Sequence, residues 1–380
     1  ITSLDDIAWL YNLRRRDVEC NPVFFAFTFI TLNNAFLFID KDQFDNDTLY
    51  DYAVKSNFIL KDYNEFTDFL YELEGLNISI CYTNTNYEYI NIVSKKNKVF
   101  NFKSPTTLFK ACKNEKEIEN NIDIHKADGL AVFRFMKYAK ETYKFKLEKL
   151  DEYKLAKKVE EFRSYDARYY EPSFETIAAW KENGAIIHYE PSINNFSEIT
   201  EDSFLLLDSG GQYDGGTTDI TRTISLGKVS KKMKHHYTLV LKSHIDLAMA
   251  KFLKGTSGSN LDMIARKPIW NEHLNYKHGT GHGIGFMLNV HEGPQSISYQ
   301  AKGNQVLMPG MIISNEPGLY FENKYGIRIE NEILVREDKK NDFGEFYKFE
   351  TITYCPYDLS CINKKELTKE EKSWLNKYHK

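Results

Sequence analysis

Five side chains of the metal-ligating type occur in a fixed order in the second half of the chain, each within a short motif. They are Asp208, Asp219, His282, Glu316 and Glu330. Four carboxylates and one imidazole can hold two divalent cations about 3.5–4 Å apart, the separation used in hydrolytic two-metal sites. Such a site requires these five distant positions to converge in the folded chain.

The first motif joins Asp208 and Asp219 across a glycine-rich turn. An apolar strand at 204–207 runs into Asp208, and Asp219 follows eleven residues later, after four glycines. Two carboxylates placed across a turn between strands can converge, and the threonines beside Asp219 can orient it through their hydroxyls. The alternative for this motif alone is an ordinary turn, because Asp and Gly are common in β-turns.

Three histidines are associated with a second, glycine-rich motif. His278 and His282 lie four residues apart among four glycines, and His291 follows before a Glu-Gly-Pro sequence. Glycine disfavours a helix here and lets the backbone approach a ligand closely. A lone histidine is usually structural, but three in one such loop favour a binding site.

Two further apolar strands carry the remaining candidates. Glu316 follows a strand at 311–314, and a strand at 325–330 alternates isoleucines with Arg328 and Glu330. Such a strand can direct Arg328 and Glu330 into a charged pocket, although an exposed ion-pair face would give the same pattern. Oxygen-rich ligation favours a hard ion such as Mn²⁺, with Zn²⁺ or Co²⁺ as alternatives.

Length and composition limit the class of protein. The 380 residues suit two or more domains, and the net charge of −4 gives no electrostatic reason to expect nucleic acid as a partner. Five cysteines without a C-x-x-C pair favour a reducing compartment, so we expect a cytoplasmic protein. No apolar run approaches the ~20 residues of a membrane helix, and the chain begins at Ile1 without a signal-peptide pattern.

The periodicity of apolar residues predicts an α/β region at 1–103 and a boundary near Ser104-Pro105. In the first region we expect strands at 7–13, 23–30, 35–39 and 78–81 and a helix at 62–73. Beyond it we expect helices at 114–146, 151–165 and 173–181. Strands should dominate 184–354, with one helix at 231–252, and a capping box begins a last helix at Thr368.

The histidines assigned to packing or solvent are His125, His235, His236, His244, His273 and His379.

These motifs resemble those of the pita-bread (creatinase/aminopeptidase) metallopeptidases and, within them, the long-form Xaa-Pro aminopeptidase family. The matching segments are 4–13, 21–25, 184–191, 207–223, 278–294 and 316–330. The resemblance implies an α+β protein with a creatinase-N-like α/β domain at 1–103 and a pita-bread catalytic domain at 104–380. It also implies that the first domain of the long form is absent from this chain.

The resemblance implies a role for each residue of the site. Asp208 would bind one metal, His282 and Glu316 the other, and Asp219 and Glu330 both. A second set would form the substrate pocket and stabilise the tetrahedral intermediate: His188, His278 and His291. Tyr320 and Arg328 fall at family positions near the substrate. Asn12-Leu-Arg14-Arg15 departs from the usual Asn-Leu-Arg-Gly, outside the catalytic domain.

The implied activity is removal of the first residue of a peptide whose second residue is proline, by a hydroxide bridging two divalent metals. The resemblance also implies a homodimer. Two alternatives remain: a prolidase acting on Xaa-Pro dipeptides, and a pseudoenzyme of the same fold that binds peptides. The match to the long form argues against a prolidase, and the presence of all five ligands argues against a pseudoenzyme.

Overall fold

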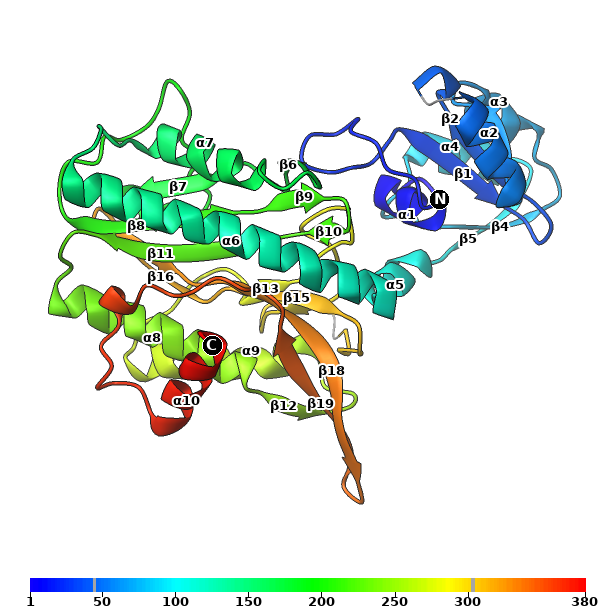
Figure 1. The fold of residues 1–380 in the computed structure, drawn as a ribbon. Helices are drawn as coiled ribbons and strands as arrows, with labels where there is room; N and C mark the ends of the chain where they lie inside the picture. The colour runs from blue at the N-terminus through cyan, green and yellow to red at the C-terminus, as the bar shows by residue number, and fades with distance from the viewer. Residues whose placement is uncertain (44–45, 302–304) are drawn as a thin grey trace. The chain divides into compact units, whose positions relative to one another are not determined.

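The computed structural model describes residues 1–43, 46–301 and 305–380. Within this range the chain divides into two compact units, Ile1–Lys110 and Ala111–Lys380, and both contain helices and strands (Figure 1). The division lies within helix α5 (Thr106–Ala111), a few residues after the expected boundary at Ser104-Pro105.

The N-terminal unit is built on two small sheets. In the first, β1 and β2 form an antiparallel hairpin and β3 pairs with β2 in parallel; in the second, β4 and β5 are parallel. An aromatic cluster that includes Phe38 and Phe66 forms its core. The elements are α1 (Leu4–Leu10), β1 (Ala26–Ile30), β2 (Ala35–Ile39), η1 (Lys41–Gln43), α2 (Asn46–Lys55), β3 (Ile59–Asp62), α3 (Glu65–Glu72), β4 (Asn77–Ile80), α4 (Tyr87–Ser94) and β5 (Lys98–Asn101).

The structure corrects one element of this unit and shortens another. The expected strand at 7–13 is wrong, because most of it belongs to helix α1. Asp5 and Asp6 lie in the first turn of α1, where carboxylates favour a helix N-terminus, and this outweighs the β propensity of the apolar residues. The run at 23–30 forms a strand only over Ala26–Ile30. The strands at 35–39 and 78–81 and the helix at 62–73 are confirmed as β2, β4 and α3.

The C-terminal unit places small antiparallel sheets between two layers of helices. Its sheets have the orders β11-β8-β7, β10-β9-β6, β12-β19-β18-β15, β13-β14 and β16-β17. The strands are β6 (Tyr169–Pro172), β7 (Ile177–Trp180), β8 (Ser203–Ser209), β9 (Gly211–Tyr213), β10 (Gly216–Thr217), β11 (Ile220–Leu226), β12 (Lys251–Leu253), β13 (Gly281–His282), β14 (Ser296–Ile297), β15 (Ile312–Asn315), β16 (Gly318–Phe321), β17 (Tyr325–Arg328), β18 (Asn331–Asn341) and β19 (Gly344–Thr351).

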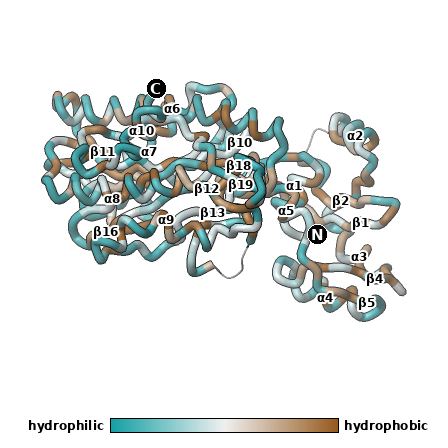
Figure 2. The backbone as a smooth tube through the Cα atoms, turned by 90° about the horizontal axis from the view of Figure 1, so that it is seen from below, coloured by the Kyte–Doolittle hydropathy of each residue, from teal (hydrophilic) through white to brown (hydrophobic). Residues whose placement is uncertain are grey.

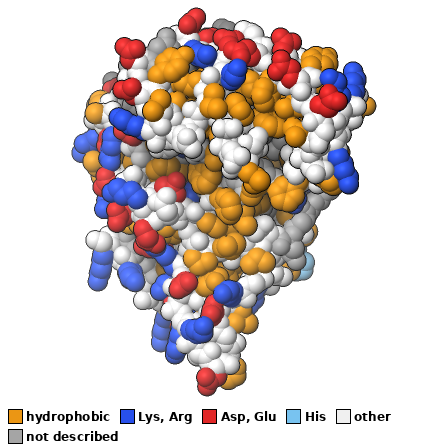
Figure 3. Space-filling model, turned by 90° about the vertical axis from the view of Figure 1, so that its right-hand side faces the viewer, with side chains coloured by type: hydrophobic (Ala, Val, Ile, Leu, Met, Phe, Trp, Pro, Cys, Tyr) orange, Lys and Arg blue, Asp and Glu red, His pale blue; other side chains and the backbone are white. Residues whose placement is uncertain are grey.

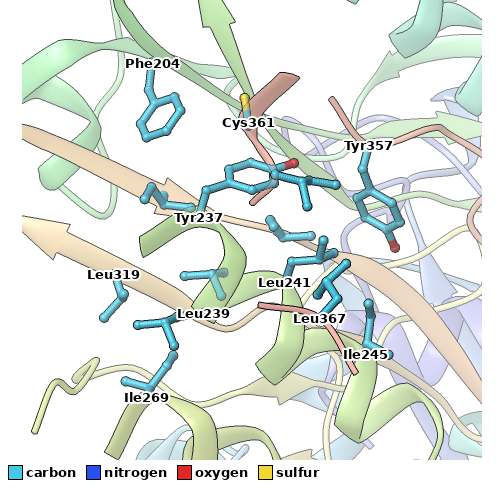
Figure 4. Packing of buried hydrophobic residues seen from close by; sticks show 14 of the residues in the cluster. Phe204, Tyr237, Leu239, Leu241, Ile245, Ile269, Leu319, Tyr357, Cys361 and Leu367 are labelled. Carbon is cyan, nitrogen blue, oxygen red and sulfur yellow. The ribbon is translucent and has the colours of Figure 1, made fainter. Parts of the chain in front are cut away.

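The two helical layers bury separate cores against these strands. The helices are α6 (Glu115–Phe145), α7 (Glu152–Arg163), η2 (Lys181–Ala185), α8 (Lys231–Ala248), α9 (Gly258–Asn271), η3 (Leu359–Cys361) and α10 (Lys369–Tyr378). Figure 1 shows α6 and α7 on one side of β7, β8 and β11, with α8 and α9 on the other. Leu205 and Leu207 of β8 pack in the cluster under α6 and α7, whereas Phe204 packs with Tyr237 of α8 (Figure 4). Alternate residues of one strand therefore join the two layers.

Several expected elements of this unit are confirmed, one is wrong, and one helix was not expected. Helix α6 begins with the capping box of Asn114, and α10 begins with that of Thr368. The expected helix at 173–181 is wrong: Ile177–Trp180 forms strand β7, which pairs with β8. Helix α9 was not expected, because Pro268 and the glycine at its first position weaken the helical pattern.

The surface mixes apolar and charged side chains, as Figure 3 shows for one face. Leu32, Val54 and Tyr87 are examples of large apolar side chains exposed in the N-terminal unit. In the tube view of Figure 2, hydrophilic and hydrophobic stretches are interspersed along the chain in both units. Among the described residues, no helix combines the length and apolar composition needed to cross a bilayer.

We expect Gly129→Ala to destabilise the C-terminal unit. A Cβ at this position of α6 would lie 1.8 Å from the carbonyl oxygen of Tyr354, so the steric clash outweighs the gain in helix propensity. The free energy of unfolding should fall by about 1–3 kcal/mol in a urea titration followed by tryptophan fluorescence. The exposed neighbour gives a control, since Leu130→Ala should change it by less than about 0.5 kcal/mol. An unchanged value for Gly129→Ala would contradict this packing.

Candidate metal centre

The five predicted metal ligands line a single cavity of about 430 Å³ in the C-terminal unit. Each is placed at or beside the end of a strand, and these strands belong to three different sheets. The cavity is lined by Phe174, Ile177, Ile187, His188, Asp208, Asp219, His278, Gly279, Gly281, His282, His291, Ser296, Ser298, Gln300, Ala301, Glu316, Arg328 and Glu330. Segments more than a hundred residues apart in sequence therefore meet at one point.

The register of β8 and β11 brings the first ligands together. Thr221 of β11 lies directly opposite Asp208 of β8, and Asp219 immediately precedes β11. Thr221 also holds Glu330: its carbonyl accepts the Glu330 N–H at 3.1 Å, and its hydroxyl donates to Glu330 Oε2 at 2.7 Å. A single residue thus links the positions of three candidate ligands.

His282 and Glu316 are positioned by the neighbouring strands β13 and β15. The Ser314 hydroxyl accepts the His282 N–H and donates to Glu316 Oε1, both at 3.0 Å. The Thr280 carbonyl accepts the Glu316 N–H at 2.8 Å. Gly281 allows this approach, because a Cβ there would lie 1.8 Å from the Ser314 carbonyl oxygen.

The hydrogen bond of the His282 ring leaves its Nε2 available to a metal. Nδ1 lies 3.1 Å from the Gly283 carbonyl, which can only accept, so Nδ1 carries the proton. Nε2 lies 3.4 Å from both Asp219 Oδ2 and Glu316 Oε1. One ligand atom each from Asp219, His282 and Glu330 lies within 4.8 Å of the others, a spacing that can surround a cation.

Asp208 offers one oxygen to the cavity and one to Arg328. The Arg328 guanidinium donates to Asp208 Oδ2 from Nε at 3.0 Å. Asp208 Oδ1 is buried and has no hydrogen-bond partner among the residues that the structure describes. A buried carboxylate oxygen without a donor is costly, and a cation would satisfy it. The donor set of four carboxylates and one imidazole therefore fits divalent metal ions.

The concentration of negative charge alters the acidity of the carboxyl groups. Burial, reinforced by the charges of Asp208 and Glu316, raises the pKa of the Asp219 carboxyl well above its ordinary value. Burial and the charge of Asp219 likewise raise the pKa of Glu330. The ionised forms of these groups need positive charge nearby, which bound cations supply.

The three predicted pocket histidines also line the cavity. His188, His278 and His291 all reach it, and the His291 ring meets the His282 ring edge to face at 4.4 Å between centroids. Burial lowers the pKa of His278 and that of His291, which favours their neutral forms.

Tyr320 reaches the site from behind His278. The His278 ring donates from Nδ1 to the Gly279 carbonyl at 2.7 Å, so Nε2 accepts the Tyr320 hydroxyl hydrogen at 2.8 Å. Arg328 in turn donates to the Tyr320 oxygen at 2.9 Å. Arg328 thus contacts Asp208 directly and His278 through Tyr320. As the alternation predicted, Arg328 and Glu330 face the cavity while Ile327 and Ile329 pack in the core.

The sequence did not predict that two further residues lie near the site. Glu332 is fully buried, and its Oε1 accepts the backbone N–H of Asp219 at 2.8 Å. His125 of α6, which we had assigned to packing or solvent, lies with Nε2 3.1 Å from the same oxygen. The only local signal is that Asn121, His125 and Asp128 are polar residues on a buried face of α6. The threonine hydroxyls expected to orient Asp219 bond elsewhere: that of Thr221 donates to Glu330, that of Thr217 donates to Gln212, and that of Thr218 accepts from the Gly211 N–H.

We expect the affinity for Mn²⁺ to increase with pH. Metal binding requires ionised carboxylates, and the raised pKa values of Asp219 and Glu330 let protons compete with the cation below those values. The Kd for Mn²⁺ of the metal-free protein should be at least ~10-fold lower at about pH 8 than at about pH 6, measured by calorimetry. A Kd independent of pH would contradict these shifts.

Sequence models of three families match the chain. Residues 1–117 match the creatinase/prolidase N-terminal domain, residues 123–337 match metallopeptidase family M24, and residues 345–380 match the C-terminal region of M24 peptidases. The M24 match covers more than half of the chain.

Curated relatives are similar over the whole chain but are longer. The probable Xaa-Pro aminopeptidase P of Botryotinia fuckeliana is 39% identical over 100% of this chain and 60% of its own length. The probable Xaa-Pro aminopeptidase P of Neurospora crassa is 40% identical over 99% of this chain and 57% of its own. The chain therefore spans about three fifths of the length of these relatives.

Solved structures share the fold. An X-prolyl aminopeptidase from Caenorhabditis elegans, described as a cytosolic enzyme with a di-nuclear active site, superposes with a TM-score of 0.89 at 33% identity, covering 99% of this chain and 62% of that one. The prolidase from Pyrococcus furiosus gives a TM-score of 0.72 at 23% identity, covering 92% and 94%. The expected α+β fold, a pita-bread domain after a creatinase-type N-terminal domain, is confirmed. The chain belongs to metallopeptidase family M24.

Proposed function

We propose that this chain carries the catalytic machinery of a metal-dependent aminopeptidase that hydrolyses the bond between the first residue of a peptide and a proline in second position. The observation that carries the proposal is the cavity in which five metal-ligating side chains meet His188, His278 and His291. The relatives named Xaa-Pro aminopeptidase P support the same reaction.

The proposed metal centre holds two divalent ions, with Mn²⁺ as our assignment and Zn²⁺ or Co²⁺ as alternatives. Asp208 would hold one ion, His282 and Glu316 the other, and Asp219 and Glu330 both. When bound, such ions lower the pKa of a water molecule and polarise the carbonyl of the scissile bond. The unpartnered Asp208 Oδ1 and the free His282 Nε2 support this assignment.

A bond that precedes proline poses a particular chemical problem. It is a tertiary amide without an N–H, so a peptidase cannot recognise it through that hydrogen. Its leaving group is a secondary amine, which must receive a proton. We assign this proton transfer to Glu316, which would take a proton from the attacking water and deliver it to the proline nitrogen. Recognition of the free N-terminal amine beside Asp208 would limit cleavage to the first residue.

The pocket histidines have the chemistry required to contact the reacting carbonyl. In its tautomer, His278 donates from Nδ1, and Glu316 Oε2 lies 4.0 Å from that nitrogen. A neutral imidazole at His291 can donate or accept a hydrogen bond to substrate without adding charge to the metal centre, and His188 and His278 line the same cavity. We propose that they hold the peptide and stabilise the tetrahedral intermediate, with Arg328 and Tyr320 fixing their orientation.

The remaining assignments are also proposals. We assign 1–103 to the creatinase-N-like domain and 104–380 to the catalytic domain. A homodimer is proposed from the family resemblance and a cytoplasmic location from the cysteine pattern, and the C. elegans enzyme is itself described as cytosolic. The proposed substrates are peptides with proline in second position.

Removal and return of metal tests the proposed reaction. The full-length protein should cleave an Xaa-Pro-Xaa peptide, lose activity after exhaustive chelation and recover it on addition of Mn²⁺, with free amino acid measured as product. Undiminished cleavage by protein shown to be free of metal would contradict the proposal. Comparison with an Xaa-Pro dipeptide separates the two related activities, because cleavage of the dipeptide alone would indicate a prolidase instead.

We expect Glu316→Gln to lower kcat by at least ~10³-fold, because the amide cannot accept the proton and is a weaker ligand. Metal content measured on the same sample shows how much of the loss is due to ligation. Glu322→Gln changes an exposed glutamate near the end of β16 and provides a control whose kcat should be unchanged. A Glu316→Gln variant with full activity would remove Glu316 from the mechanism.

A further inference from the structure

Helix α9 carries a buried ion pair directly behind the glycine-rich loop of the cavity. Asp262 and Arg266 are four residues apart on α9, and Arg266 Nε lies 2.7 Å from Asp262 Oδ2. Both side chains are almost completely inaccessible to solvent. The pair belongs to none of the ligand or pocket sets described above, so its role requires a separate explanation.

The Arg266 guanidinium holds the backbone that leads into His278. Its NH1 donates to the Tyr276 carbonyl and its NH2 to the His278 carbonyl, both at 2.8 Å. NH1 also donates to Asn275 Oδ1 at 3.1 Å. The Tyr276 ring stacks on the guanidinium, with its centroid 3.9 Å from the central carbon. The planar group is therefore fixed in orientation as well as in position.

Asp262 connects the two chain segments that form this wall of the cavity. Its Oδ1 accepts the Thr280 hydroxyl hydrogen, and its Oδ2 accepts the backbone N–H of Tyr299 at 2.8 Å. Thr280 lies between His278 and His282, and Tyr299 lies between Ser298 and Gln300, which line the cavity. One carboxylate thus joins the histidine loop to the facing segment.

The same loop also positions a candidate metal ligand. The Thr280 N–H donates to the Ile297 carbonyl at 2.7 Å, and the Thr280 carbonyl accepts the Glu316 N–H at 2.8 Å. Helix α9 is itself packed closely against the facing strand, because a Cβ at Gly258 would lie 1.9 Å from the Ser296 carbonyl oxygen. A shift of α9, which carries the ion pair, would therefore disturb the wall of the cavity.

We propose that Arg266, held by Asp262, is a positioning residue that fixes His278 in the orientation needed to contact substrate. This inference rests on the function proposed above. Lysine could not substitute, because a single ammonium group lacks the planar fork that reaches Asp262 and the two carbonyls at once. Loss of the fork would release the His278 carbonyl and let the His278 ring move, while the pairing of β13 with β14 and the hydrogen bonds of Ser314 keep His282 and Glu316 in place.

The chain contains a matched pair for comparison. Arg163 Nε lies 2.7 Å from Asp128 Oδ1, and both side chains are as fully buried as those of the α9 pair. Arg163 NH2 also donates to Asp128 Oδ2 at 3.4 Å, and the Tyr213 hydroxyl donates to Asp128 Oδ1 at 2.8 Å. None of these three residues lines the cavity. Arg163→Lys therefore disturbs a buried arginine–aspartate ion pair without touching the histidine loop.

The test compares Arg266→Lys and Arg163→Lys in the full-length protein. For each we measure kcat and KM on an Xaa-Pro-Xaa peptide, metal content, melting temperature and the ring signals of ¹⁵N-labelled histidines. Arg266→Lys should lower kcat by ~10²-fold with little change in metal content, the loss expected for a catalytic group misplaced by about 1 Å. Its His278 ring signals should shift or broaden.

Arg163→Lys should lower the melting temperature while leaving kcat/KM and the His278 signals unchanged.

Thr280→Val provides a second, milder variant, since it removes the hydrogen bond to Asp262 and leaves Arg266 intact. It should also reduce kcat, as Arg266→Lys does. A normal kcat and unchanged His278 signals in Arg266→Lys and Thr280→Val would overturn the proposal. If the wild type does not cleave the peptide, the proposed function fails, and the histidine signals alone still decide whether Arg266 positions His278.

Discussion

The mutual repulsion of four carboxylates held at one partly enclosed point is the constraint on which the rest of this structure depends. Like charges repel more strongly away from bulk water, so the folded chain has to impose their proximity. Hydrogen bonds from the backbone and from Thr221 and Ser314 do this, and Arg222 adds a buried positive charge behind the site. Arg222 donates to the carbonyls of Thr221 and Glu330 at 2.9 and 2.6 Å. Bound cations would neutralise the negative charge of the carboxylates that these protein groups leave uncompensated.

The architecture of the C-terminal unit follows from the same requirement. Strand β8 sends Leu205 and Leu207 into one core and Phe204 into the other, and then presents Asp208 to the cavity. Strand β17 does likewise with Ile327 and Arg328. The apolar residues that fix each strand between the helical layers thus also fix the ligand at its end. Helices far from the ligands in sequence contribute as well, through Glu332 beside His125 of α6 and through Arg266 of α9.

Much of the fold and of the site could be predicted from local sequence. Helix α6 has clear capping residues and a long periodic pattern, and the alternation at 325–330 correctly predicted which side chains face the cavity. The errors arose where tertiary contacts outweigh local pattern. Ile177–Trp180 is a strand because it pairs with β8, and α9 forms despite Pro268 because it packs on α8 and β14. Glu332 and Arg266 could not be recognised, since a residue that acts through a backbone amide or carbonyl leaves no motif of its own, and His125 reaches the site only through Glu332.

The central claim is that these five side chains hold a pair of cations. It is tested most directly by anomalous diffraction at the manganese edge from crystals of the full-length protein grown with Mn²⁺. We predict two peaks about 3.5–4 Å apart, with Asp208 beside one, His282 and Glu316 beside the other, and Asp219 and Glu330 between them. A single peak, or peaks away from these side chains, would contradict the account.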